Sequence, residues 1–486
     1  MIPLQVKVKS DDSNTTSLSF SDDVLLLEQN KKFGVTNKPI KISSRYILSV
    51  YLDKSNDARI IIKALLPQGK LSLKLDTFSF EVIDEEAAKL WIKKINDAVY
   101  KGAKSAKHFK VFINPFGGAG IAENNFNQSV KPIFDATGCT YDITLTGYSN
   151  HTKEIVKDLN LKAYDAIVTV SGDGIIHEVI NGLLSRDDAL EIDIPIGVIP
   201  LGSGNGLSIC LLGDDHGNSL PHAALNIIKG IPMKIDICSV TQGEERYYSF
   251  MSLNYGIIAD CDLATEHMRF LKDFRFVIGA VQALLANRKY SCEIAMKIVE
   301  DSTDKIKEGY RKDYNSSISH VEDESKEIQN KDHDSSSTLR VENKSKGIVD
   351  KYGSVNDPIP SDWTVLNDDG YIFIAGKVPW LSRKQIVFPC ALPSDGLLDL
   401  MMVNLENTSK LKVANILASF KQGTHIDMKE VKYYKVAALR LSPKNKDTGY
   451  ISIDGEKVPF KPFQVEVHPK LINVLSIDGR YAPTNI

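Results

Sequence analysis

The stretch from Ala166 to Asn181 constrains the fold of this chain more than any other. Its first five residues, 166–170, form a short apolar run that is typical of a buried strand. A Ser-Gly-Asp-Gly turn follows at 171–174, and the apolar residues after it recur at helical spacing. A strand, a glycine turn and a helix in this order offer unpaired amide N–H groups to an anion such as phosphate. An ordinary turn in which Asp173 caps the helix explains the same residues, and this stretch alone does not separate the two interpretations.

Composition and charge limit the class of protein. The 486 residues are 43% hydrophobic and 25% charged, as in ordinary globular proteins, and the length predicts more than one domain. With a formal net charge of -3, the chain lacks the bulk positive charge of many nucleic-acid-binding proteins, so we expect no nucleic-acid partner. The six cysteines contain no Cys-x-x-Cys pair, which indicates a reducing intracellular compartment and cysteines buried in the core.

The sequence predicts neither a leader peptide nor a membrane span. Its first residues lack an apolar run, and the segment that comes nearest to a span, Phe276 to Ala286, is shorter than the roughly 20 apolar residues that a transmembrane helix needs. We therefore expect a protein that can lie on a membrane but does not cross it.

Residues 1–105 predict a separate module. Short β-like runs such as Tyr46 to Leu52 are followed by a helical segment, Glu85 to Tyr100, whose apolar face carries Trp91. Several strands closed by one C-terminal helix resemble the architecture of a pleckstrin-homology (PH)-like module. A module that binds lipid headgroups and an accessory module without a ligand both fit this resemblance.

The rest of the chain predicts fold class α/β + β. From 106 to 232 strands alternate with helices, which is typical of a three-layer α/β domain with a parallel sheet. From 233 to 486 the apolar period is two, which predicts a mostly antiparallel β domain. Within it, residues 300–358 are rich in Lys, Glu, Asp, Ser and Asn, and we expect a disordered insertion there. The predicted α/β strands are 109–113, 141–145, 166–170 and 196–199, and the predicted helices are 121–136, 149–159, 175–185 and 221–229.

Three glycine-rich turns follow three of the predicted parallel strands. They span Asn114 to Gly120, Ser171 to Gly174 and Pro200 to Gly206. The first is not a P-loop, because no Gly-Lys-Ser/Thr follows, and not a dinucleotide fingerprint, because Glu123 replaces the third glycine. Since the carboxyl ends of parallel strands meet at one edge of a sheet, we expect the turns to converge there. Such an edge suits a nucleotide polyphosphate held by backbone amides.

The same turns resemble a known family. Asn114-Pro-x-Gly-Gly-x-Gly, Ser171-Gly-Asp-Gly174 with His177-Glu178, and Gly202-Ser-Gly-Asn205 are similar to the motifs of the diacylglycerol-kinase-type catalytic domain of lipid kinases. The segments 256–263 and 269–275 are most similar to those of sphingosine kinases, the long-chain-base kinases. The resemblance covers roughly 108–300 and 358–478. It implies that the α/β domain binds ATP with Mg²⁺ and that the β domain is an antiparallel β-sandwich, which binds a sphingoid base whose primary hydroxyl is phosphorylated.

The resemblance also implies a role for each site residue. Asp173 matches the general base, and Asp262 matches the carboxylate that pairs with the ammonium group of the base. If their segment were a strand, Asp260 and Asp262 would share a face. The substrate-binding positions are Ser171, Gly172, Asp173, Gly174 and Asp262. The nucleotide-binding positions are Asn114, Pro115, Phe116, Thr146, Gly147, Tyr148, Ser149, Asn150, Glu178, Gly202, Ser203, Gly204, Arg269, Arg275, Asp454, Gly455 and Glu456.

Partners and rival functions follow from the same resemblance. It implies a cytoplasmic enzyme that associates reversibly with intracellular or plasma membranes, and a calmodulin-type partner for residues 276–289, for which core packing is the alternative. A ceramide or diacylglycerol kinase would share the fold, and Asp262 speaks against both. A catalytically silent lipid-binding scaffold would not need Asp173 and both arginines. Ala119 and Leu201 depart from the family's motifs and bear on nucleotide affinity only, and we expect His177 to be satisfied by helix packing.

Overall fold

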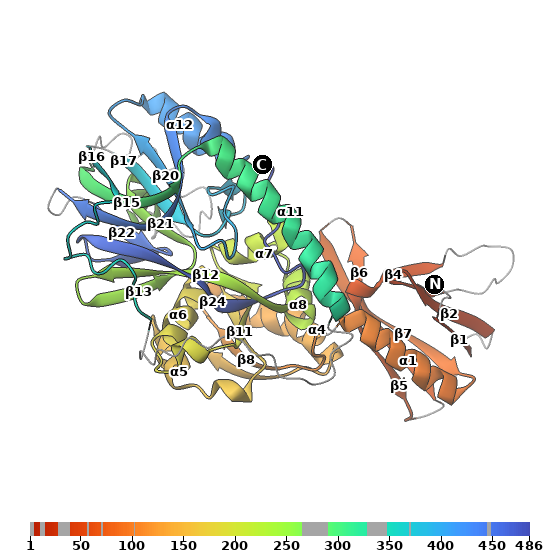
Figure 1. The fold of residues 1–486 in the computed structure, drawn as a ribbon. Helices are drawn as coiled ribbons and strands as arrows, with labels where there is room; N and C mark the ends of the chain where they lie inside the picture. The colour runs from red at the N-terminus through yellow and green to blue at the C-terminus, as the bar shows by residue number, and fades with distance from the viewer. Residues whose placement is uncertain are drawn as a thin grey trace.

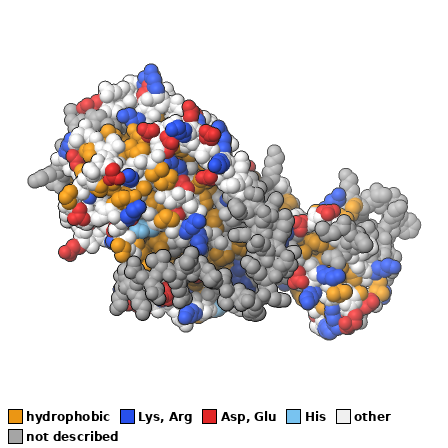
Figure 2. Space-filling view, in the orientation of Figure 1, with side chains coloured by type: hydrophobic (Ala, Val, Ile, Leu, Met, Phe, Trp, Pro, Cys, Tyr) orange, Lys and Arg blue, Asp and Glu red, His pale blue; other side chains and the backbone are white. Residues whose placement is uncertain are grey.

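The structure is a computed structural model that describes residues 4–9, 15–27, 39–55, 58–69, 71–101, 103–264, 290–327, 348–368, 371–444 and 449–486. An α/β domain and a β domain lie against each other, and the N-terminal module lies at one end of the molecule (Figure 1). On the face drawn in Figure 2, acidic and basic side chains are interspersed. Among the helices described, none is long and apolar enough to span a bilayer. The segment 276–286 lies outside these residues.

The α/β domain contains the four predicted parallel strands. They are β8 (His108–Ile113), β9 (Thr140–Leu145), β10 (Ala166–Ser171) and β11 (Pro195–Pro200), in the order β9-β8-β10-β11. The two faces of the sheet belong to different hydrophobic clusters. Ile167 and Ile196 pack with α5 (His151–Asp158) and α6 (Asp173–Leu184), whereas Val168 and Ile199 pack with α4 (Lys131–Ala136) and α8 (Leu220–Lys229). The expected three layers are therefore present.

Two helical regions of this domain differ from the sequence analysis. The predicted helix at 121–136 is broken into α3 (Ala122–Asn125), a π-helical turn (Phe126–Val130) and α4. An additional helix, α7 (Gly206–His216), begins directly after the third glycine turn. Sequence analysis assigned it no element because Gly206 and Gly213 flank only a short apolar run, and Gly213 has a non-helical φ of 80°.

The two larger domains share one sheet. Strand β24 (Phe463–Ser476) pairs parallel with β11 at its end and antiparallel with β12 (Ile231–Gln242) and β21 (Val431–Pro443). A boundary at residue 232 therefore falls inside a strand that joins the domains. The other strands of this 15-stranded sheet in the β domain are β13 (Glu245–Ser249), β14 (Ser252–Gly256), β15 (Cys292–Glu300), β16 (Thr364–Asp368), β17 (Tyr371–Gly376), β20 (Leu398–Asn404), β22 (Ile451–Ile453) and β23 (Glu456–Val458).

The expectation of disorder from 300 to 358 is wrong for much of that range. Helix α11 (Thr303–Glu327) crosses the molecule diagonally in Figure 1, and its Ile306 and Tyr310 are buried in the β-domain core. The Tyr310 hydroxyl contacts both the amide and the hydroxyl of Thr484. The segment 348–358 is also ordered against the sheet, because Arg440 donates to the carbonyls of Ser354 and Asp357. Composition missed this helix since only a few of its residues are apolar; residues 328–347 lie outside the described part.

In its described residues, the N-terminal module consists of a seven-stranded antiparallel sheet and one α-helix. The strand order is β4-β3-β2-β1-β7-β6-β5, and α1 (Glu85–Tyr100) buries Trp91 and Ile95 against it, as predicted. Asp84 caps α1 by accepting a hydrogen bond from the amide of Ala87. The strands are β1 (Leu4–Lys9), β2 (Thr15–Ser21), β3 (Val24–Leu27), β4 (Ile40–Ser43), β5 (Ile47–Asp53), β6 (Arg59–Gln68) and β7 (Ser72–Val82).

A buried lysine joins this module to the α/β domain. The ammonium group of Lys229, at the end of α8, donates to the backbone carbonyls of Ser44 and Val99. Arg45 adds a bidentate ion pair with Asp478, at 2.7 and 3.0 Å. The five cysteines whose side chains are described are unpaired and buried, as expected.

Candidate active site

Two of the glycine turns lie in direct backbone contact. A Cβ atom on Gly202 would lie 2.2 Å from the Cα of Gly172, and one on Gly172 would lie 2.4 Å from the carbonyl oxygen of Gly204. Two hydrogen bonds join the turns, from the amide of Asp173 to Gly204 (3.1 Å) and from that of Leu201 to Ser171 (3.0 Å). Only glycine allows so close an approach, which explains the residue type at both positions.

The first turn joins the same cluster. A Cβ atom on Gly117 would lie 2.8 Å from the carbonyl oxygen of Leu201, and the amide of Asn114 donates to Val170 at 3.2 Å. The side chain of Asn114 accepts a hydrogen bond from the amide of Phe116, whose ring is 77% exposed. The three turns therefore converge at one edge of the sheet, as the strand pattern predicts. Pro115, between them, is half-buried.

Asp173 lies at the centre of this cluster, and its carboxylate binds the start of α7. One carboxylate oxygen accepts the amide of Gly206 at 2.6 Å, and the other accepts that of Leu207 at 3.1 Å. The aspartate therefore caps a neighbouring helix rather than its own. Burial raises the pKa of Asp173 to about 6, because the two amides only partly offset the loss of water and the charge of Asp454 acts in the same direction as burial. A carboxyl group with this pKa is mostly ionised at neutral pH.

The third turn is held by a residue to which sequence analysis gave no role. The side-chain oxygen of Asn205 accepts the amide of Gly202 at 3.0 Å, and its nitrogen donates to the carbonyl of Gly202 and to Asn218. Asn205 also directly precedes the two amides that bind Asp173. Its place after a Gly-Ser-Gly turn and before an apolar run was the available signal, since asparagine is common at helix starts.

Glu178 organises the loop 146–150, whose residues are among the predicted nucleotide-binding positions. Its carboxylate accepts the amides of Asn150 (2.9 Å) and Thr152 (3.0 Å), which begin α5. In the loop itself, Thr146 is buried while Tyr148 is 58% exposed, with its ring stacked on His151 at 4.5 Å. Glu178 and the loop 146–150, all predicted to bind the nucleotide, therefore lie together. Gly147, Ser149 and Asn150 are exposed, as is Ser203 of the third turn, whereas Gly202 and Gly204 are half-buried.

Asp454 reaches the site from the β domain, but its carboxylate is fully occupied there. It accepts hydrogen bonds from three successive amides, 250–252, from the hydroxyl of Ser249, and from Nδ1 of His177 at 2.9 Å. His177 thus forms a hydrogen bond between the domains, whereas sequence analysis expected it to be satisfied by helix packing. Two residues later, Glu456 is exposed, and its carboxylate lies 3.7 Å from the position of a Cβ on Gly174. Gly455 is the half-buried link between them.

The candidate lipid-binding residues are only partly described. Residues 257–264 form helix α9 and not a strand, so positions 260 and 262 do not share a face. Asp260 is buried and accepts a hydrogen bond from the hydroxyl of Tyr290 at 2.8 Å. The side chain of Asp262, both Arg269 and Arg275, and all of 276–289 lie outside the described residues.

Comparison with known protein families identifies both domains. Residues 108–240 match the diacylglycerol kinase catalytic domain, and residues 352–476 match the YegS C-terminal NAD kinase beta sandwich-like domain. Sphingoid long chain base kinase 4 of Schizosaccharomyces pombe is 32% identical over 466 residues, which cover 94% of this chain and 92% of that protein. The chain belongs to the sphingoid long-chain-base kinase family. The second domain is accordingly a β-sandwich, as the sequence analysis expected.

Other members of the family agree with this assignment, and a solved structure agrees with the fold. Sphingoid long chain base kinase 5 of Saccharomyces cerevisiae is 33% identical over 81% of this chain and 63% of its own length, and human sphingosine kinase 1 is 28% identical over 75% and 90%. A crystal structure from Bacillus anthracis, described as a candidate diacylglycerol kinase, superposes with a TM-score of 0.53 at 15% identity. It covers 77% of this chain and 97% of its own. This likeness supports the fold of the two kinase domains.

Proposed function

We propose that this member of the family transfers the γ-phosphate of ATP to the primary hydroxyl group of a sphingoid long-chain base. The observation that carries the proposal is the position of Asp173, which lies buried between two glycine turns with both carboxylate oxygens held by amides of α7. Phosphoryl transfer needs mainly positioning and stabilisation of charge, and a fixed carboxylate beside a phosphate-binding edge supplies both.

Asp173 acts as the general base in this proposal. Each of its oxygens accepts one amide and keeps a further lone pair, to which the substrate hydroxyl can donate its hydrogen. The hydroxyl oxygen then attacks the γ-phosphorus, its proton passes to Asp173, and ADP leaves. A pKa of about 6 makes the carboxylate a stronger base than an exposed aspartate while leaving it ionised at neutral pH.

ATP fits the three glycine turns, whose close backbone contact leaves amide donors and little side-chain bulk at one edge. Three carboxylates near the turns, of Asp173, Glu178 and Asp454, already accept at least two amides each. We therefore assign no protein ligand to Mg²⁺, which would arrive on the triphosphate and neutralise its charge. The proposed nucleotide contacts remain those given by the family motifs, Arg269 and Arg275 included.

Two of the proposed roles are reassigned in detail. Glu178 orders the loop 146–150 by capping α5, so it would act on the nucleotide through that loop. Asp454 would hold the turn that carries Gly455 and Glu456 and would not touch the nucleotide itself, because its oxygens accept five hydrogen bonds. Glu456, exposed beside Gly174, is the member of this motif that is free to face a ligand.

Substrate choice is proposed to rest on Asp262, whose negative charge would pair with the ammonium group that a sphingoid base has and that ceramide and diacylglycerol lack. Because the substrate is a lipid, we propose a cytoplasmic protein that binds membranes reversibly. The seven strands and terminal helix of the N-terminal module support a PH-like assignment. A calmodulin-type partner for 276–289 stays a proposal from the resemblance alone.

The test is phosphate transfer from labelled ATP by the purified full-length chain, offered sphinganine, ceramide and diacylglycerol in parallel. We expect label on sphinganine only, loss of transfer in Asp173→Asn, and a raised KM for sphinganine in Asp262→Ala. Asp260→Asn is the matched control, since Asp260 is buried against Tyr290. Transfer to ceramide or diacylglycerol would overturn the substrate assignment, and ATP binding without transfer to any of the three would favour a silent scaffold.

A further inference from the structure

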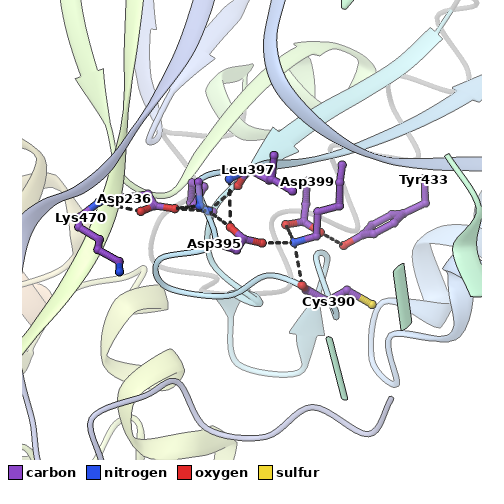
Figure 3. Close-up of polar contacts among 10 residues, drawn as sticks. Asp236, Cys390, Asp395, Leu397, Asp399, Tyr433 and Lys470 are labelled. Atoms are coloured by element: carbon purple, nitrogen blue, oxygen red, sulfur yellow. Dashed lines mark hydrogen bonds and ion pairs between the residues drawn. The ribbon is translucent and has the colours of Figure 1, made fainter. Parts of the chain in front are cut away.

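A network of buried charges lies in the β domain, away from the proposed chemistry (Figure 3). It contains two lysines and three aspartates, all nearly inaccessible to water: Lys377, Lys435, Asp236, Asp395 and Asp399. The lysine nitrogens and aspartate oxygens are 2.6–2.9 Å apart in all four ion pairs. Burial lowers the pKa of Lys377, but the charges of Asp395 and Asp236 outweigh burial and raise it overall. Both lysines are therefore charged in the folded protein.

The network closes the base of a loop. Lys377 begins the segment 377–397, and its ammonium group contacts Asp395 at 2.6 Å and the carbonyl oxygen of Leu397 at the other end. Asp236, on β12, accepts the amide of Gly396 at 2.7 Å. One buried lysine thus joins the two ends of this loop and ties them to a strand shared by both domains. An alternative loop position would leave these charges buried and unpaired, which is unfavourable.

The tip of the same loop packs against the start of α7. It contains the short strands β18 (Trp380–Ser382) and β19 (Gln385–Ile386). A Cβ atom on Gly206 would lie 2.9 and 3.0 Å from the carbonyl oxygens of Trp380 and Leu381. The amide of Trp380 also contacts the sulfur of Cys210 at 3.5 Å, and the amide of Lys384 donates to Asp214 at 2.9 Å. The loop therefore packs against Gly206, whose amide binds Asp173.

We propose that Lys377 is a positioning residue, which holds the loop 377–397 against α7 and thereby keeps the amides of Gly206 and Leu207 on the carboxylate of Asp173. Lys377 fixes the base of the loop through Asp395, Trp380 of the same loop lies against Gly206, and the amide of Gly206 binds Asp173. The structural part of this inference is independent of the reaction, and its kinetic part rests on the proposed function.

The test compares the full-length variants Lys377→Met and Tyr433→Phe. Tyr433 donates to Asp399 at 2.6 Å and belongs to the same network, but this hydrogen bond joins it to β20 and not to Lys377 or Asp395 at the loop base. Hydrogen exchange is measured first, at the amides of 206 and 207. These are first-turn amides, which have no partner within their own helix, so their protection reports the contact with Asp173. We expect protection to be lost in Lys377→Met and kept in Tyr433→Phe.

Kinetics form the second readout. In Lys377→Met we expect kcat to fall roughly ten- to hundredfold, with KM for ATP changed less than about twofold, because the carboxylate of Asp173 loses the two amides that orient it while the glycine turns stay in contact. The acid limb of the pH profile should move to higher pH, since the two amides lower the pKa of Asp173. Among the described residues, the other titratable groups near Asp173 are Asp454, Glu456, His177 and Cys210, and neither substitution changes them.

Each outcome decides a separate question. Wild-type protection and an unmoved acid limb in folded Lys377→Met would refute the positioning role. Absence of lipid phosphorylation by the wild-type chain would refute the proposed function and leave the exchange result valid. If Lys377→Met does not fold, Gly206→Ala tests the same contact from the other end, because its Cβ would press on Trp380 and Leu381. Unchanged protection at Leu207 in that variant would equally refute the inference.

Discussion

The contact between the glycine turns predicts that two substitutions only two residues apart have very different effects on the free energy of unfolding. In Gly172→Ala, the new Cβ would lie 2.4 Å from the carbonyl oxygen of Gly204 and 3.1 Å from the Cα of Gly202, whereas in Gly174→Ala its nearest neighbour is a side-chain oxygen at 3.7 Å. Gly172 has φ -86° and ψ -167°, which alanine adopts without strain. Any destabilisation by Gly172→Ala is therefore due to the clash between the turns.

The size of the effect follows from that overlap. The turns must separate by roughly 0.6 Å before the contact reaches even 3.0 Å, and forcing extra atoms into a packed site costs about 1–3 kcal/mol. Gly174 lies in the first turn of α6, where alanine is favoured over glycine by up to about 1 kcal/mol. We therefore expect Gly172→Ala to lower the free energy of unfolding by about 1–3 kcal/mol and Gly174→Ala to leave it unchanged or raise it.

The assay is denaturant unfolding of both variants beside the wild type, followed by kcat for sphinganine. Because Asp173 donates its amide to Gly204, separation of the turns displaces the proposed base, and a shift approaching 1 Å can cost about a hundredfold in rate. Equal stability of Gly172→Ala and the wild type would refute the reasoning. Equal destabilisation by both substitutions would mean that backbone freedom, and not contact between turns, selects glycine here.

Three further predictions concern charge and capping. The rate kcat should fall about tenfold per pH unit below pH 6, as Asp173 with its pKa of about 6 becomes protonated, and a limb near pH 4 would contradict the burial argument. Glu178→Ala should remove the cap of α5, worth about 1 kcal/mol, and raise KM for ATP about fivefold. Glu178→Gln keeps one acceptor, so its loss of stability and its rise in KM should be smaller. An unchanged KM in Glu178→Ala would exclude the loop 146–150 from the nucleotide site. Burial lowers the pKa of Lys229 to about 7, below its usual 10.5, so between these two pH values the unfolded chain binds one proton more than the folded chain. The free energy of unfolding should therefore rise with pH across this window by up to about 1.4 kcal/mol per pH unit. A thermal-unfolding series in which Lys229→Met keeps the full wild-type slope would refute this.

Periodicity predicted the elements that depend on local sequence. The four predicted parallel strands are confirmed: β10 and β11 are short buried runs, whereas β9 alternates apolar and polar residues. The helix carrying Trp91 is also confirmed, and its apolar face has a clear 3.6-residue period. The carboxyl ends of parallel strands meet at one edge of a sheet as a general rule. The convergence of three glycine turns was therefore predictable before any contact was known.

Elements without a strong period were missed. Helix α7 lies between two glycines, and α11 has few apolar residues, so neither gave a sufficient pattern. The expectation of disorder was wrong for residues 303–327, because buried contacts of Ile306 and Tyr310 with the rest of the chain stabilise a helix that composition does not favour. Sequence analysis assigned no element to 257–264, where helix α9 forms, since eight residues are too few to separate the helical period from that of a strand.

The sequence by itself determined the family, the strand–turn–helix units and the aspartate at their centre, because these depend on residues close together in the chain. Tertiary structure alone decided which groups those residues meet. It brought β24 from the far end of the sequence beside β11, placed the amides of α7 on Asp173, and occupied Asp454 with amides from another strand. It also closed the loop 377–397 with Lys377. Hydrogen bonds and buried ion pairs depend on distances of about 3 Å between groups, and only the packed fold sets distances between residues far apart in sequence.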